Sequence, residues 1–320
     1  MSQSDPRTSI AKATAWLIGG VAWTIFYLAR LVPARLVSWV AVPLGRAIRP
    51  LMGLGIKTSL LDRVEQVLGP FAGPDAEDAF WQKRLRHLGL TVFEPFHLFW
   101  SSDEELEACV ELVGEEHLKS ARDGGNGAIL FLNHLGNPGT LVTTLGGLRG
   151  YDTAFAGNQI VACIAGRDVP LEGVESLVTR MFSRAKVERV LLGPGLPGRM
   201  AGVLARNGLF GMFMDFPVVE KHNRLMPFGH ARMTLNLGPA LLALRHRVPV
   251  FAVTTVRTGL NQHRLTVTPL ALPEKGVGLE ERAADLIEAG TTRMLEALRE
   301  YPDQWWPWEH APLAPSPDHP

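Results

Sequence analysis

The sequence has very little cysteine, with only Cys109 and Cys163 among its 320 residues. The two do not form a CxxC pair, and no cluster of cysteines and histidines accompanies them. This scarcity argues against a disulfide framework and against a structural zinc site. It also favours a reducing compartment for the folded chain.

An excess of charge of either sign is missing as well. The chain carries 32 basic and 32 acidic residues, so its formal net charge is zero. A dedicated DNA- or RNA-binding protein usually contains a strongly basic domain, so this balance argues against a nucleic-acid partner. There is no low-complexity repeat, and 46% of the residues are hydrophobic, which excludes a disordered chain.

Two common catalytic and nucleotide-binding signatures are also absent. The sequence contains no G-x-S-x-G and no Walker A segment, and its G-x-G-x-x-G match at Gly193-Pro-Gly-Leu-Pro-Gly198 is interpreted as a turn rather than a phosphate-binding loop. A serine hydrolase of the usual kind and a nucleotide-binding protein therefore lose their main sequence support. A lipid hydrolase is a third possible class, because such enzymes use similar pockets, but this sequence lacks their serine elbow.

The charges that are present are unevenly placed. Residues 1–70 contain eight basic and three acidic residues, which gives this segment a net charge of +5 and the remaining residues −5. Between Lys12 and Arg30 the segment has no charged residue, and this apolar stretch includes two tryptophans. As a helix it is about 25 Å long, at the short limit for crossing a membrane.

The composition of this N-terminal stretch favours a helix that lies in or dips into a membrane interface. Aromatic residues and flanking arginines are typical of such helices, because the cations meet anionic lipid head groups. Two alternatives are a helix docked on the protein's own core and a cleaved signal peptide. The signal peptide has no convincing cleavage site, since Arg30 and Pro33 follow the apolar stretch.

The pattern of apolar runs and helical segments predicts one α/β domain at residues 59–310. It is preceded by a membrane-associating helical segment at 1–58 and followed by a loose proline-rich tail at 311–320. Short apolar runs predict strands at 128–132, 160–165, 187–192, 209–214, 248–256 and 265–270. Helices are expected at 60–68, 75–88, 90–100, 104–121, 140–148, 174–183, 197–205, 237–246 and 280–300. The alternation predicts a mainly parallel sheet with helices on both faces.

Polar residues follow two of the predicted strands directly. In open α/β sheets, ligands bind beyond the carboxyl ends of the strands. His134 stands in this position after strand 128–132, and Asp215 stands there after strand 209–214. A histidine at such a site can act as a general base, and Asp215 can fix its tautomer if the two strands are close. The alternative is that His134 is a turn residue bonded only to backbone groups.

These residues also carry a resemblance to a known family. The segment His134-Leu-Gly-Asn137 after a buried strand resembles the His-Phe-Gly-Asn-Trp-Glu segment of bacterial lipid A late acyltransferases. Those enzymes are lauroyl and myristoyl transferases of the lysophospholipid acyltransferase superfamily, and mycobacterial phosphatidylinositol mannoside acyltransferases have a similar segment. Further matching pieces follow in the family's order at Met214-Asp215, Pro227-Phe-Gly229, Thr234, Gly238-Pro239, Pro249 to Arg257, and Tyr301 to His310.

The resemblance implies O-acyl transfer. An acyl thioester of acyl carrier protein or coenzyme A would donate to a hydroxyl of a membrane lipid or glycolipid, with His134 as the general base. No cofactor or metal is implied, because a thioester is already activated. The resemblance places the protein at the cytoplasmic face of a bacterial inner membrane, peripherally or through its N-terminal segment.

The sequence departs from the family's motif at one position. The family has aspartate or glutamate at the fifth residue after the histidine, where this chain has Gly139. Glycine cannot orient an imidazole or balance its charge. Three interpretations follow. Asp215 takes over as the partner of His134, the acceptor's own group assists a slow enzyme, or the protein is an inactive relative that binds acyl chains or a carrier protein.

Four further residues are predicted to contact substrate. Arg167 could hold a phosphate or carboxylate group, or pair with Asp168 on the surface. Arg257 ends a strand at the same edge as His134. Asn137 could shape the turn or contact ligand. Thr234 could bind a head group or cap the helix that follows it.

Three tryptophans near the C-terminus are expected to serve the core rather than the chemistry. Trp305, Trp306 and Trp308 are predicted to be core or interface anchors instead of a cation-binding box. His310 is expected to be structural, and Cys163 is expected to be inert within a strand.

Overall fold

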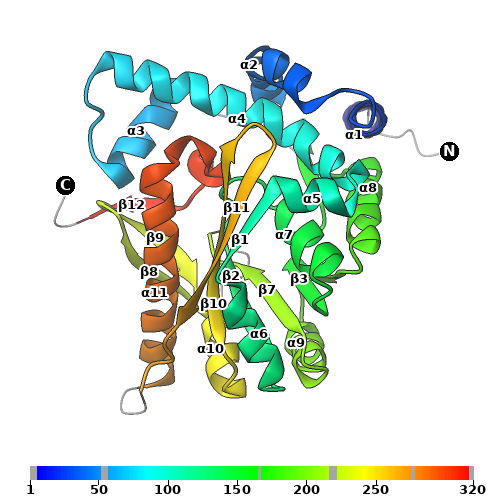
Figure 1. Ribbon diagram of the computed structural model, residues 1–320. Coiled ribbons are helices and arrows are strands. Elements are labelled where there is room, and N and C mark those ends of the chain that lie inside the picture. The colour runs from blue at the N-terminus through cyan, green and yellow to red at the C-terminus, as the bar shows by residue number, and fades with distance from the viewer. Residues whose placement is uncertain (1–5, 52–56, 165–166, 216–221, 275–277, 317–320) are drawn as a thin grey trace.

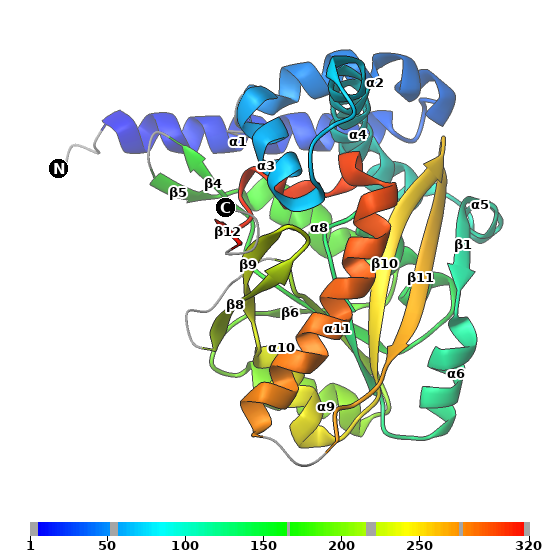
Figure 2. The same ribbon diagram turned by 90° about the vertical axis from the view of Figure 1, so that its left-hand side faces the viewer.

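The structure is a computed structural model that describes residues 6–51, 57–164, 167–215, 222–274 and 278–316. Figure 1 shows a twisted central sheet with helices on both faces, and Figure 2 shows the N-terminal helices lying together at one end of the molecule. Cys163 lies in a strand, as expected, but its side chain is outside the described part of the chain.

A seven-stranded sheet forms the centre of the fold. Its order is β1 (Val110–Val113), β11 (Gln262–Leu270), β10 (Val250–Gly259), β2 (Ala128–Leu132), β7 (Leu209–Phe213), β3 (Thr153–Gly157) and β6 (Glu188–Leu191). The five strands from β10 to β6 are parallel. Strand β11 is antiparallel to β10, and β1 runs parallel to β11. The prediction of a mainly parallel sheet is therefore confirmed.

Strand β2 is central because both of its faces are apolar. All five of its residues are buried, as expected for a parallel strand covered on both sides. Ile129 and Phe131 belong to the core on one face of the sheet. Ala128, Leu130 and Leu132 belong to the core on the other face, which follows from the two-residue period of a strand.

The helices divide between these two cores. They are α3 (Lys57–Leu68), α4 (Pro74–Trp100), α5 (Asp103–Cys109), α6 (Glu115–Asp123), α7 (Gly139–Leu141) with the π-helix η1 (Val142–Leu148), α8 (Glu172–Arg184), α9 (Leu196–Ala205), α10 (Gly238–His246) and α11 (Leu279–Glu300). Helices α3, α9, α10 and α11 contribute to the first core. Helices α6, α7 and η1 contribute to the second.

Two predicted helices, at 75–88 and 90–100, are a single helix, so that prediction was wrong. Helix α4 passes straight through Gly89. A Cβ atom at position 89 would collide with the carbonyl oxygen of Ala41 in helix α2 (Ala34–Leu51). Gly89 is therefore present to let two helix backbones approach each other closely, and not to end a helix.

The predicted helix at 104–121 was also wrong, because the segment forms α5, β1 and α6. Ser102 and Glu105 make a reciprocal capping box that starts α5. The chain then extends as β1, whose pairing with β11 satisfies its backbone. Gly114 has φ of 82°, a left-handed conformation that suits glycine, and α6 begins after it.

Two other predictions need correction at the edges of the fold. The run at 160–165 is not part of the main sheet, because β4 (Val161–Ile164) pairs with β5 (Arg167–Pro170) in a separate hairpin. The tail is not loose at 313–315, where β12 (Leu313–Pro315) pairs with β9 (Ala231–Asn236). Strand β8 (Asn223–Phe228) completes this small sheet. In both cases, pairing with another strand determines the structure of the segment.

The N-terminal residues form helix α1 (Pro6–Leu28) and helix α2, and both pack on the α/β body. By length and composition, residues 9–28 of α1 could cross a membrane. Helix α2 lies against α4, and α1 lies against α8 and the β4–β5 hairpin. The domain boundaries at 58 and 310 stay predictions.

Candidate active site

The register of two neighbouring strands brings the predicted pair together. Strands β2 and β7 are hydrogen-bonded in parallel, with Leu132 opposite Phe213 at their carboxyl ends. His134 and Asp215 each lie two residues beyond these positions. Parallel strands end at the same edge of a sheet, so both side chains reach the edge where ligands bind in open α/β folds.

The Asp215 carboxylate is fully buried and holds three donors. Its Oδ1 lies 2.8 Å from Nδ1 of His134. Its Oδ2 accepts the backbone N–H of His134 at 2.7 Å and the indole Nε1–H of Trp305 at 2.9 Å. A buried carboxylate needs such partners to offset its lost hydration. The three donors therefore fix the position of this group.

The imidazole of His134 is held in one orientation. Its ring stacks on Phe213 with centroids 4.1 Å apart and an interplanar angle of 21°. Because the Asp215 carboxylate accepts at Nδ1, the proton of a neutral ring belongs on Nδ1 and Nε2 is the basic nitrogen. The side chain is 28% exposed. This arrangement can perform general-base chemistry.

A C-terminal segment fastens the loop that carries His134. The backbone N–H of Trp306 donates to the carbonyl of His134 at 2.9 Å, and the N–H of Gly136 donates to the carbonyl of Gln304 at 3.1 Å. An isolated β-bridge also joins Leu135 to Trp305. The loop is therefore supported by residues about 170 positions later in the chain.

Gly139 lies away from the Asp215 contact. A Cβ at this position would be 3.0 Å from Oδ1 of Asn137 and 3.4 Å from Cβ of Pro95. The direction of a side chain at 139 is thus toward helix α4. The Nδ1 atom of His134 is meanwhile already bonded to Asp215.

Behind the loop lies a buried ion pair between Glu94 of α4 and Arg257 of β10. The Arg257 Nε atom donates to Glu94 Oε1 at 2.5 Å, and its Nη2 donates to Oε2. Its Nη1 also donates to Nδ1 of His87 at 2.7 Å. Burial alone would raise the pKa of Glu94, but the Arg257 guanidinium outweighs burial and lowers it.

Two predicted substrate contacts belong to this buried network. Asn137 is fully buried, and its side-chain amide donates to Glu94 Oε2 at 3.5 Å. The Oδ1 atom of Asn137 accepts the N–H of Gly139 at 2.9 Å, so Asn137 shapes the turn. Arg257 is 9% exposed. Both side chains thus have protein partners behind the loop.

The other two predicted contacts lie outside the main sheet. Arg167 is exposed at the start of β5 in the separate hairpin. Thr234 lies in β9, and its backbone N–H donates to the carbonyl of Pro312 at 3.1 Å. It does not cap α10, whose N-cap is Leu237 and has no side-chain capping bond. Neither residue lies at the carboxyl ends of β2 and β7, where His134 and Asp215 meet.

Sequence reasoning missed three residues that shape the site. Trp305 was predicted to be a core or interface anchor rather than part of the site, and Phe213 and Glu94 were not considered. A buried tryptophan usually finds a partner for its N–H, which is the signal that could have singled out Trp305. Glu94 is the lone acidic residue in the mainly apolar stretch 88–100, which also indicates a specific partner.

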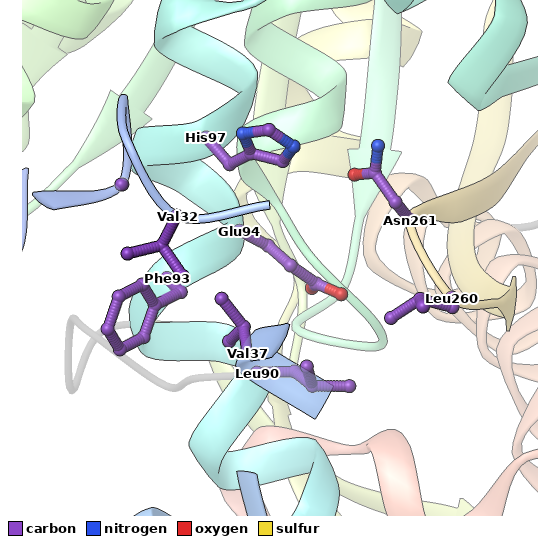
Figure 3. Close-up of a pocket in the computed structure, with 9 residues that line it drawn as sticks. Val32, Val37, Leu90, Phe93, Glu94, His97, Leu260 and Asn261 are labelled. Carbon is purple, nitrogen blue, oxygen red and sulfur yellow. The ribbon is translucent and has the colours of Figure 1, made fainter. Parts of the chain in front are cut away.

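A shallow, mainly apolar pocket opens beside the Glu94 network. Figure 3 shows Glu94 and His97 of α4 facing it together with Asn261 from the turn between β10 and β11. The rest of its lining is Ala29, Val32, Val37, Leu90, Phe93 and Leu260. Within the described ranges, no group of three histidine, cysteine, aspartate or glutamate side chains is arranged to hold a metal ion.

Comparison with known protein families places this chain. The family model described as bacterial lipid A biosynthesis acyltransferase matches residues 2–305. This match covers nearly the whole chain, including the His134 loop, Asp215 and Trp305. No curated protein matches the sequence.

Proposed function

The chain belongs to the bacterial lipid A biosynthesis acyltransferase family, and from this we propose that it moves a fatty acyl group from a thioester to a lipid hydroxyl. The donor is an acyl carrier protein or coenzyme A thioester, and the acceptor is a membrane lipid or glycolipid. The observation that carries the proposal is the 2.8 Å contact between the His134 ring and the Asp215 carboxylate.

The chemistry follows from this contact. Nε2 of His134 takes the proton of the acceptor hydroxyl as its oxygen attacks the thioester carbonyl carbon. The C–S bond then breaks, and the proton passes from the imidazolium to the leaving thiolate. Asp215 stabilises the imidazolium while it exists. The products are an ester and a free thiol, so protons and electrons balance with no further reactant.

Asp215 supports the active interpretation of the Gly139 departure. In a serine protease triad, loss of the orienting carboxylate lowers the rate by about 10⁴. Here that orientation comes from Asp215 on a neighbouring strand. The missing acid at position 139 therefore does not leave the imidazole without a carboxylate partner.

The proposed site of action is the cytoplasmic face of a bacterial inner membrane. Acyl carrier protein and coenzyme A thioesters are cytoplasmic donors, and the two-cysteine composition fits a reducing compartment. The apolar helix α1 is compatible with contact to the membrane that holds the acceptor.

Among the predicted substrate contacts, we propose different roles. Arg167 is exposed, which suits an anionic group of the substrate. Thr234 stays a candidate for a head-group contact. Asn137 and Arg257 act from behind, by holding the loop and helix α4 in place.

A transfer assay tests the proposal. Purified full-length protein on phosphatidylglycerol-containing vesicles is given labelled acyl carrier protein or coenzyme A thioester and a lipid and glycolipid extract. The wild type and His246→Ala, which changes an exposed histidine of α10, are expected to form a labelled ester, and His134→Ala is not. Acyl binding without transfer from either donor would favour the inactive relative and overturn the proposal.

A further inference from the structure

Helix α1 is packed on the body from Ala11 onward. Its inner face is a stripe of buried positions spaced mainly four residues apart, which places them on one side of a helix. The stripe consists of Ala11, Ala15, Gly19, Phe26 and, just after the helix, Ala29. These residues are mostly small, so the helix backbone lies close to the surface beneath it.

Two specific contacts hold this inner face. At its middle, a Cβ added to Gly173 of α8 would be 2.7 Å from Cα of Gly19, so the two backbones touch with no room for a side chain. Near its end, the Trp100 indole donates to the carbonyl of Phe26 at 2.8 Å. The Phe26 ring also packs against Phe99 of α4 with centroids 5.0 Å apart. The middle and the C-terminal end of α1 are therefore anchored.

The N-terminal segment also exposes large apolar side chains, on α1, on α2 and on the connection between them. Trp16 is 80% exposed and Leu17 is 60% exposed on α1. Leu31 in the connection is 76% exposed, and Trp39 on α2 is 83% exposed. Tryptophan is a residue that soluble surfaces rarely expose to this degree. It is enriched where a protein meets the interface of a bilayer.

The positive charge of residues 6–51 indicates what kind of surface these helices bind. Residues 6–51 contain six basic residues and no acidic residue. Lys12, Arg30, Arg35 and Arg46 are exposed among the apolar side chains. Basic groups interleaved with exposed tryptophans complement an anionic lipid surface. The same face on a second copy of the chain would place like charges together, which disfavours a dimer.

We propose that α1 and α2 lie in the plane of one leaflet of an anionic bilayer and that α1 does not cross the membrane. Figure 2 shows both helices at the same end of the molecule, with the sheet below them. A spanning α1 would have to leave Gly173 and Phe99, and the Trp100 indole would lose the Phe26 carbonyl that accepts its N–H. The docked helix instead offers its outer side to lipid while keeping its contacts.

Vesicle binding tests the surface. The full chain is mixed with vesicles of phosphatidylglycerol and phosphatidylethanolamine, and with phosphatidylcholine vesicles. Trp16→Ser and Trp39→Ser are each expected to weaken binding to the anionic vesicles about tenfold. Leu272→Ser, an exposed residue at the opposite end of the molecule, is expected to leave binding unchanged. The proposal would be overturned if the protein did not bind vesicles and instead formed a dimer that Trp39→Ser dissociates.

Labelling tests whether α1 crosses. With Cys109 and Cys163 changed to serine, single cysteines are placed at Ser2 and at Arg299, an exposed position of α11. The proteins are expressed in a bacterium, and spheroplasts are treated with an impermeant maleimide before and after lysis. The in-plane arrangement predicts the same labelling for both positions. Labelling of the two cysteines from opposite sides would show a span.

The contact with α8 provides a third readout, on vesicle-bound protein. Gly19→Leu is expected to lower the Tm clearly, because a side chain cannot fit against the Gly173 backbone. The matched variant Gly20→Leu is expected to leave the Tm unchanged, because a Cβ at Gly20 has no atom within 4 Å. Equal melting of the two variants on vesicles would mean that α1 has left α8. None of these tests measures acyl transfer, so they can fail or succeed independently of the proposed activity.

Discussion

Asp215 holds His134 at two points, accepting the backbone N–H at 2.7 Å and approaching ring Nδ1 at 2.8 Å. One carboxylate therefore positions both the loop and the imidazole that the loop carries. The two residues come from adjacent parallel strands and not from one motif. This relationship explains how a chain with glycine at the motif's acidic position keeps an oriented histidine.

The indole of Trp305 is expected to support Asp215. Trp305→Phe keeps an aromatic ring but removes the N–H that donates to Asp215 Oδ2. We expect about 1–3 kcal/mol of lost stability from the unsatisfied carboxylate and a fall in kcat of about tenfold. Trp308→Phe is the matched control, because Trp308 is equally buried and its N–H donates to the carbonyl of Pro302. It should lower the stability while leaving kcat unchanged.

Restoring the motif's acid is expected to bring no gain. In Gly139→Asp the new side chain would start 3.0 Å from Asn137 Oδ1 and 3.4 Å from Pro95 Cβ. The added carboxylate would therefore face α4 and strain the turn. Activity should stay equal or fall, and the Tm should decrease. A tenfold rise in transfer rate would show instead that the acid at this position reaches the chemistry.

The Glu94–Arg257 pair is expected to be a strong stability determinant. Glu94→Gln leaves a buried guanidinium without its carboxylate, and breaking one side of such a pair costs about 3–5 kcal/mol. Urea unfolding measures this loss. The double variant Glu94→Leu with Arg257→Leu removes both charges and should be less destabilised than the single variant. A single variant within about 1 kcal/mol of wild type contradicts the assigned role.

Acid sensitivity is expected to come from His263 of β11. This side chain is 1% exposed, neither ring nitrogen has a hydrogen-bond partner among the described residues, and burial lowers its pKa to about 4. In the unfolded chain the pKa is about 6.5. As the pH falls from 6.5 to 4, the unfolded state takes up the proton first. Stability therefore falls by about 1.4 kcal/mol per pH unit for this group.

The variant His263→Phe tests this origin. A phenyl ring fills a similar volume without polar atoms that need partners, so stability at pH 7 should be equal or higher. Urea unfolding between pH 7 and 4 should then show a shallower loss than in wild type. Part of the slope should persist, because burial and Arg257 also hold the pKa of His87 well below its ordinary value. An unchanged slope would contradict the assignment to His263.

Local patterns were enough to locate the strands that carry the site. Strand β2 was predicted with its observed bounds, and β7 was predicted within one residue, because uninterrupted apolar runs indicate buried parallel strands. Whether a glycine ends a helix or lies inside one was not predictable from such local patterns. Gly89 sits inside α4 because another helix packs against it, and that neighbour is not visible in the local sequence.

The candidate site was only partly predictable for a related reason. The positions of His134 and Asp215 at strand ends could be read from the sequence. Their contact required β2 and β7 to be neighbours, which depends on the order of the whole sheet. Trp305 reaches Asp215 from 90 residues away, so no local spacing indicates it. The engagement of Arg257 by Glu94 likewise depends on how α4 crosses the sheet.

The rate of acyl transfer by Asp215→Asn decides whether Asp215 is the functional partner of His134. Asparagine keeps the size of the side chain and an oxygen for the Trp305 indole, but it cannot stabilise an imidazolium or impose the same tautomer. Single-turnover transfer from labelled thioester to lipid hydroxyl is compared with wild type, with circular dichroism to check the fold. We expect a folded variant that is slower by about 10³ to 10⁴. A folded variant with the wild-type rate would contradict this expectation.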